Sequence, residues 1–216
     1  MRYFLLFLAV LTIGMGCSNK KKYHDVVKAE SGNSTSGAIN DILQFQKELD
    51  KAFKDPETSP LPDRYRKDFK GLNFFESDTN YRIMAKLVRT PDAIPFMMPT
   101  TTDRKSAEVV YGIAHFQLNG KPYQVEVYRS PELQQKEKYK DYLFLPFLDE
   151  TNGTETYSGG RYIDLSSPEG DSIQIDFNKA YNPYCAYNKK YSCPIVPKVN
   201  LLDTKVLAGV KAFKKE

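Results

Sequence analysis

Histidine and cysteine are scarce in this chain of 216 residues, which has 2 histidines and 3 cysteines. His24 lies in a polar N-terminal stretch, and His115 falls on the expected solvent face of a strand. A Ser-His-Asp or Cys-His arrangement therefore has no suitable base. A zinc site of the usual His/Cys kind lacks ligands too, because Cys17 has another expected role and only Cys185 and Cys193 remain. No phosphate-binding or dinucleotide-binding motif is present, so we expect no metal and no cofactor.

The chain also lacks a strong excess of either charge. Lys and Arg together number 31 and Asp and Glu number 27, which gives a net charge of +4. This balance is too mild and too mixed to predict nucleic-acid binding. The length suits one well-buried domain, and nothing in the sequence requires a second.

The apolar run at the N-terminus is too short to span a bilayer. It covers 14 residues from Tyr3 to Gly16, whereas a transmembrane helix needs about 20. A positive start precedes it and Cys17 follows it, so residues 1–16 are predicted to be a lipoprotein signal peptide. Acyl chains on Cys17, palmitate among them, would anchor the protein in the bacterial cell envelope, facing the periplasm. Plain secretion is the alternative.

Composition divides the rest of the chain into three parts. Residues 17–37 are polar and form the predicted lipidated tether. Residues 38–54 carry apolar side chains at helical spacing, including Ile42, Leu49 and Phe53, and predict an amphipathic helix that ends before Pro56. Residues 55–216 form the predicted β domain.

Short alternating runs and turn signals predict a mainly β fold, either an antiparallel β-sandwich or an open barrel with the one N-terminal helix. The clearest local structure is a hairpin around Asn119-Gly120, a type I′ turn signal. Its register places Phe116 opposite Tyr123 and Ala114 opposite Val125.

A second hairpin is predicted from residues 162–165 and 172–177. Matching its apolar sides places Ile163 opposite Ile175. Tyr162, Asp164 and Asp176 would then share the other face, with Arg161 pointing away from it. Residues 206–213 are predicted to form one last strand.

Two phrases carry a resemblance to a known family. They are Gly159-Gly-Arg-Tyr-Ile-Asp164 and Asp176-Phe-Asn-Lys-Ala-Tyr-Asn-Pro-Tyr-Cys-Ala-Tyr-Asn188, the second followed by Cys193-Pro194 and Pro197. Both resemble the signature of the bacterial domain of unknown function 1684 family, over a stretch from about Asp55 to Phe213. The resemblance implies a small domain, often associated with the cell envelope, with no established activity.

Two functions fit these residues. The first is an envelope-anchored binding or interaction module for a small polar ligand or an envelope protein. The alternative is a hydrolase of cell-envelope glycans or related small polar substrates, which needs paired carboxylates. A calcium site at Asp164, Asp176 and Asn178 is a minor alternative. The catalytic candidates are Glu155, Asp164 and Asp176, and the binding candidates are Arg161, Tyr162, Asn178, Tyr181, Asn182, Tyr187 and Asn188.

Cys185 and Cys193 lie eight positions apart in a chain predicted to be exported. Exported cysteines usually pair, so we predict a disulfide that closes the tyrosine-rich loop. Two buried thiols are the alternative.

Overall fold

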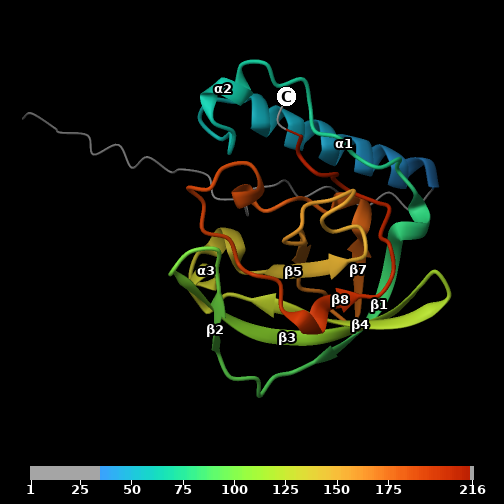
Figure 1. Ribbon diagram of the computed structural model, residues 1–216. Helices are drawn as coiled ribbons and strands as arrows, with labels where there is room; N and C mark the ends of the chain where they lie inside the picture. The colour runs from blue at the N-terminus through green and yellow to red at the C-terminus, as the bar shows by residue number, and fades with distance from the viewer. Residues whose placement is uncertain (1–34, 215–216) are drawn as a thin grey trace, which may run out of the picture.

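The structure is a computed structural model, and it describes residues 35–214 (Figure 1). The predicted signal peptide, Cys17 and nearly all of the tether lie outside the described residues. Within residues 35–214, no helix is both long enough and apolar enough to cross a bilayer.

One 8-stranded sheet dominates the fold, and it curls into a nearly closed barrel. The path of hydrogen-bonded strands is β6-β5-β4-β3-β1-β7, with β2 added on β3 and β8 added on β5. All pairs are antiparallel except β5 with β8. The mainly β prediction is confirmed, and the architecture is the open barrel. The strands are β1 Arg82–Arg89, β2 Phe96–Pro99, β3 Lys105–Leu118, β4 Lys121–Arg129, β5 Tyr142–Asp149, β6 Arg161–Ser166, β7 Ser172–Asp176 and β8 Leu201–Leu202.

Helices are few. The longest is α1, and most others are single turns that connect strands. They are α1 Thr35–Lys54, α2 Asp63–Arg66, η2 Thr79–Tyr81, α3 Pro131–Gln134, η3 Glu137–Tyr139, η4 Phe177–Lys179, η5 Tyr184–Ala186 and η6 Lys198–Asn200.

The hairpin of β3 and β4 forms in the predicted register. Phe116 pairs with Tyr123 and Ala114 with Val125. Asn119 and Gly120 both have positive φ, as a type I′ turn requires. Local turn chemistry and alternation are enough to determine this pairing.

The second predicted hairpin is wrong. Ile163 in β6 pairs with Leu145 in β5, and Ile175 in β7 pairs with Ile83 in β1. Both isoleucines still belong to the apolar core cluster. Matching the apolar sides identified the buried faces, but it does not select the partner strand. Strands β6 and β7 are instead the first and last strands of the hydrogen-bonded path.

The predicted last strand at residues 206–213 is also wrong. This segment has only an isolated bridge, between Val210 and Phe74. Gly209 has a φ of +78° and interrupts the extended run. The carbonyls of Val206 and Ala208 accept hydrogen bonds from a side chain, Arg161, instead of from a neighbouring strand.

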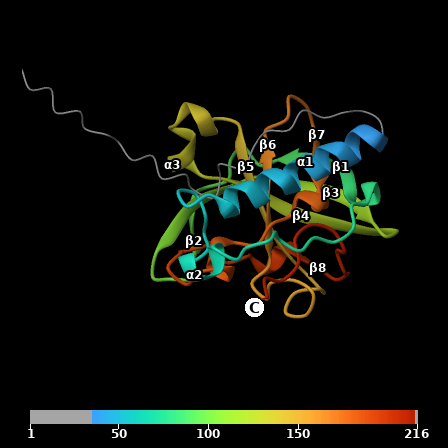
Figure 2. The same ribbon diagram turned by 90° about the horizontal axis from the view of Figure 1, so that it is seen from above.

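Apolar side chains form two clusters. The larger one includes residues from β1, β3, β4, β5, β6 and β7. The second joins outward-facing aromatic residues, such as Tyr128, Phe144 and Tyr162, to residues of α1 and of the loops after β7. Figure 1 shows the orange and red segments that follow β7 between α1 and the strands, and Figure 2 looks down on α1 from above. Phe53 of α1 is 2% exposed and packs edge-on against Tyr187 at 4.8 Å.

Candidate functional site

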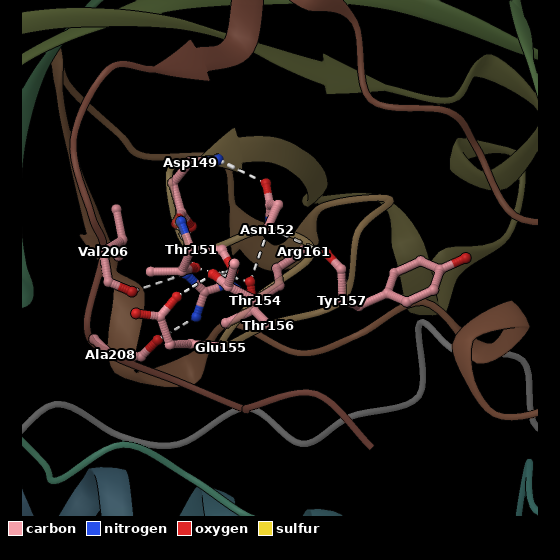
Figure 3. Close-up of polar contacts among 10 residues, drawn as sticks. All are labelled: Asp149, Thr151, Asn152, Thr154, Glu155, Thr156, Tyr157, Arg161, Val206 and Ala208. Carbon is pink, nitrogen blue, oxygen red and sulfur yellow. Dashed lines mark hydrogen bonds and ion pairs between the residues drawn. The ribbon is translucent and has the colours of Figure 1, made fainter. Parts of the chain in front are cut away.

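Arg161 is the largest fully buried side chain of the described residues, and its guanidinium lies between the end of β5 and the C-terminal segment. Nη2 donates to Oδ2 of Asp149 at 2.5 Å and to the Val206 carbonyl at 2.9 Å, and Nη1 donates to the Ala208 carbonyl. The ring of Phe147 lies 5.1 Å from the guanidinium carbon. Both members of the ion pair have side chains with 0% exposure. Figure 3 shows Asp149, Val206 and Ala208 around the Arg161 side chain.

The loop that follows β5 holds Asp149 in place. The Thr151 amide donates to Oδ1 of Asp149 at 2.7 Å, and the Thr151 hydroxyl contacts the same oxygen. Asn152 accepts from the Asp149 amide at 2.8 Å and donates to the Thr156 hydroxyl at 2.9 Å (Figure 3). The carboxylate therefore has protein donors on both oxygens.

Glu155, another acid of this loop, is not the partner of Arg161. Glu155 is partly exposed and pairs with Lys205 at 2.7 Å. The hydrogen bond from Lys205, with a second from Thr154, lowers the pKa of Glu155 to about 2. The sequence contained the true partner, Asp149, but separated it from Arg161 by a loop whose path no local pattern predicts.

Asp164 accepts from two tyrosines. The Tyr142 hydroxyl donates to its Oδ1 at 2.9 Å, and the Tyr181 hydroxyl donates to the same oxygen at 2.6 Å. Asp164 and Tyr142 are partly exposed, whereas Tyr181 is buried. Tyr162 is buried beside them: its hydroxyl donates to the Pro194 carbonyl and its ring lies edge-on to Phe144 at 4.8 Å. This group brings two predicted binding tyrosines and one predicted acid together.

Asp176 belongs to a different network. Its Oδ1 accepts from the amide of Asn178 at 3.0 Å and from the Asn178 side chain at 2.8 Å. Arg82 lies 3.9 Å from Oδ2 of Asp176 and 3.3 Å from the carboxylate of Asp41 in α1. Lys179 pairs with the same Asp41 carboxylate at 3.0 Å. Burial raises the pKa of Asp176, and the hydrogen bonds from Asn178 oppose that rise. Asp164 and Asp176 do not lie opposite each other, because β6 and β7 pair with other strands.

The other predicted binding residues hold the loop after β7. Asn182 donates to the Lys211 carbonyl at 3.0 Å and to the Tyr187 hydroxyl at 3.3 Å. Asn188 accepts from the Lys190 amide at 3.2 Å. Asn182 and Tyr187 are buried, so their contacts are structural, whereas Asn188 is partly exposed.

Cys185 and Cys193 are free thiols in this structure. The Cys185 amide donates to the Cys193 sulfur at 3.2 Å, and the Tyr157 hydroxyl lies 3.8 Å from the Cys185 sulfur. The predicted disulfide is not formed here, although the two side chains meet, and it stays a prediction for the oxidised protein.

Comparison with known proteins identifies the relatives of this chain. Residues 67–211 match the family described as "Protein of unknown function (DUF1684)". The chain belongs to this family. The match covers both phrases quoted above, which contain Arg161, Tyr162, Asp164 and the two cysteines, so it confirms the resemblance.

A solved structure supports the same conclusion for the fold. The solution NMR structure of an uncharacterized protein from gene locus rrnAC0354 of Haloarcula marismortui is similar, with 33% identity and a TM-score of 0.64. The similarity covers 82% of this chain and 95% of that one. No curated protein matches.

Sequence reasoning missed Glu108, which lies in β3 opposite Phe96 of β2. It is 4% exposed; its Oε1 accepts from the Ser106 hydroxyl at 2.8 Å, and its Oε2 has no hydrogen-bond partner among the described residues. Burial raises the pKa of Glu108 to about 7. The hydrogen bond from Ser106 and the charge of Arg104 lower this pKa, whereas the charge of Glu132 raises it. No sequence signal marked this residue, because a glutamate beside an alternating run resembles an ordinary solvent-facing side chain.

Glu108→Gln is expected to flatten the pH dependence of stability of this DUF1684 protein. The folded-state pKa of about 7 lies above the ordinary value of 4.5, so the native state holds more protons than the unfolded state between these values. Stability therefore falls as pH rises through that window, by on the order of 3 kcal/mol. Urea unfolding between pH 4 and pH 8 measures the fall. In Glu108→Gln the fall should lose the part that comes from Glu108 and keep the part that comes from Asp176. In Ser106→Ala it should move to higher pH, and an unchanged fall in both variants would contradict the assignment.

Proposed function

We propose that this DUF1684 protein is an envelope lipoprotein, anchored through acylated Cys17, whose barrel domain binds a small polar ligand or an envelope protein. The polar group around Asp164 would be the contact surface. This proposal combines the N-terminal sequence pattern with the arrangement of the acids in the described residues.

The observation that carries the binding proposal is the pairing of the acids. Asp149 is bound by Arg161, Glu155 by Lys205, and Asp176 by Asn178. A glycoside hydrolase needs two carboxylates that flank one bond, one protonated and one ionised. The candidate acids of this chain lie in separate networks, so the geometry supports binding over hydrolysis.

Asp164 is the candidate acid best placed to meet a ligand. It is partly exposed, and the buried Tyr181 and partly exposed Tyr142 fix the orientation of its carboxylate. A carboxylate that is oriented before binding loses little entropy when it accepts from a hydroxyl or an ammonium group. The expected ligand class is therefore a polyol, a sugar or an amine, or a protein side chain with the same donors.

Asp164→Asn is expected to lower the free energy of unfolding by about 1–3 kcal/mol, because two tyrosine hydroxyls lose a charged acceptor. Thermal melts of the full chain with a panel of sugars, polyols and amines test the binding. A ligand should raise the melting temperature of the wild type and not that of Asp164→Asn. Lys205→Ala, which alters an exposed pair with Glu155, is the matched control. A melting temperature raised by Asp164→Asn, together with hydrolysis of a panel member, would favour the hydrolase.

Cys17→Ser is expected to move the protein from the membrane fraction to the soluble fraction, because acyl attachment requires the thiol. Membrane sedimentation followed by immunoblotting measures the distribution, with Cys185→Ser as the control that keeps the anchor. If Cys17→Ser still sediments with membranes, the protein is held there by another part of the chain.

A further inference from the structure

Cys185 and Cys193 differ in exposure although they contact each other. Cys193 is 2% exposed, whereas Cys185 is partly exposed on the single turn η5. The Cys193 thiol hydrogen-bonds to the Cys185 sulfur, and the Cys185 amide donates back to the Cys193 sulfur at 3.2 Å. Cys185 is therefore the more accessible of the two residues, and Cys193 lies beside it. This is the arrangement of an attacking thiol and a resolving thiol.

Several donors surround the Cys185 sulfur. The Cys193 thiol has the largest effect, and the Tyr157 hydroxyl, 3.8 Å from the sulfur, adds to it. Together they lower the pKa of Cys185 to about 6, and the same bond raises the pKa of Cys193. The two sulfurs therefore titrate as a pair that shares one proton near neutral pH. Arg104, which donates to the Ser192 hydroxyl at 3.0 Å, adds positive charge near Cys193.

Gly159 of the family phrase lets Tyr157 reach this site. A Cβ at Gly159 would lie 2.5 Å from Cε1 of the Tyr157 ring. Figure 3 shows that this ring points away from the Arg161 network. The phrase that holds Arg161 therefore also delivers a donor to the cysteine pair.

The loop that carries the pair is held without a disulfide. The Thr101 amide donates to the Cys193 carbonyl at 2.9 Å, and the Cys193 amide donates to the Thr101 hydroxyl at 3.1 Å. The ring of Tyr187 packs on Phe53, and Tyr184 packs on Tyr191 at 5.2 Å. A bond between the sulfurs adds little to a loop already fixed in this way, so it can form and break while the loop stays folded.

We propose that Cys185 and Cys193 form a thiol–disulfide exchange site, with Cys185 as the attacking thiolate and Cys193 as the resolving thiol. The substrate is a molecule that contains a disulfide. The Cys185 thiolate attacks one substrate sulfur, a mixed disulfide forms, and the first substrate thiolate leaves and takes a proton from water. Cys193 then attacks the Cys185 sulfur, the bond between Cys185 and the substrate breaks, and the proton of Cys193 passes to the departing second thiolate. One substrate disulfide is reduced to two thiols, and one Cys185–Cys193 disulfide forms.

Alkylation of the reduced full chain tests the thiolate directly. Iodoacetamide labelling across pH, mapped to each cysteine by mass spectrometry, should give a rate midpoint near pH 6 at Cys185 and almost no labelling at Cys193. Cys193→Ala should move that midpoint toward the ordinary value of about 8.5, and Tyr157→Phe should move it less in the same direction. A midpoint at the ordinary value in the wild type would overturn the proposal, and this measurement needs no variant.

Oxidised glutathione tests the exchange. The wild type should release two equivalents of reduced glutathione and form the internal disulfide, which dithiothreitol should reduce again without unfolding the protein. Cys193→Ser keeps a hydroxyl donor but lacks the resolving sulfur, so it should stop as a mixed disulfide at Cys185. Cys185→Ser should form none at Cys193. If Cys193→Ser carries no glutathione, the pair is inert. If the wild-type disulfide can be reduced only after denaturation, the disulfide is purely structural.

Discussion

Arg161→Ala is expected to lower the free energy of unfolding by about 3–5 kcal/mol, because it leaves the buried Asp149 carboxylate without its cation. The same change removes the donors to the Val206 and Ala208 carbonyls. Phe147 loses a neighbouring group as well. Urea unfolding at neutral pH measures the loss.

Arg161→Lys and Lys205→Ala serve as controls. An ammonium keeps the charge, but it has no planar fork to reach Asp149 and two carbonyls together, so Arg161→Lys should recover only part of the loss. Lys205→Ala removes a pair whose side chains are 52% and 35% exposed, and it should change stability little because solvent screens the pair. An equal effect of Arg161→Ala and Lys205→Ala would show that the buried pair contributes no more than a surface pair.

Gly160→Ala is expected to destabilise the protein by about 2–5 kcal/mol. Gly160 has a φ of +86°, which costs other residues about 1–2 kcal/mol. A Cβ there would also lie 2.6 Å from the Phe147 carbonyl oxygen and 2.7 Å from Cγ2 of Val196, and overpacking adds about 1–3 kcal/mol. Chemical denaturation compared with the wild type gives the value.

Gly120→Ala isolates the backbone contribution. Gly120 has a similar φ of +77°, but a Cβ there would meet nothing within 4 Å. The stability lost in Gly120→Ala should therefore stay near the 1–2 kcal/mol that the left-handed conformation costs. If the two alanine variants lose equal stability, the contact with Phe147 and Val196 is not what requires glycine at position 160.

The elements that could be predicted are those whose pairing is determined by residues close together in the sequence. The β3–β4 hairpin follows from the Asn119-Gly120 turn and from alternation on both sides, and its register is the observed one. The predicted β6–β7 hairpin failed because the five residues between the strands, which include Pro168 and Gly170, do not fix the pairing as a two-residue turn does. Each strand could therefore pair elsewhere while Ile163 and Ile175 kept the same buried sides.

The candidate site was predictable in its residue types but not in its partners. The family phrases marked Arg161, Tyr162, Asp164 and the cysteines, and the structure brings several of them into specific contacts. The acceptors of Arg161 come from three distant positions, two of them backbone carbonyls. A carbonyl is present at every residue, so the sequence carries no information about which ones a buried guanidinium will bind.

The position of those carbonyls affects how the barrel closes. Two acceptors of Arg161 belong to Val206 and Ala208, which follow all of the described strands in the sequence. Without this segment, the barrel would have to enclose a cation that lacks most of its acceptors. Closure of the barrel is therefore expected to wait until residues 206–208 have docked, and a chain truncated before residue 206 should remain sensitive to protease although it contains every described strand.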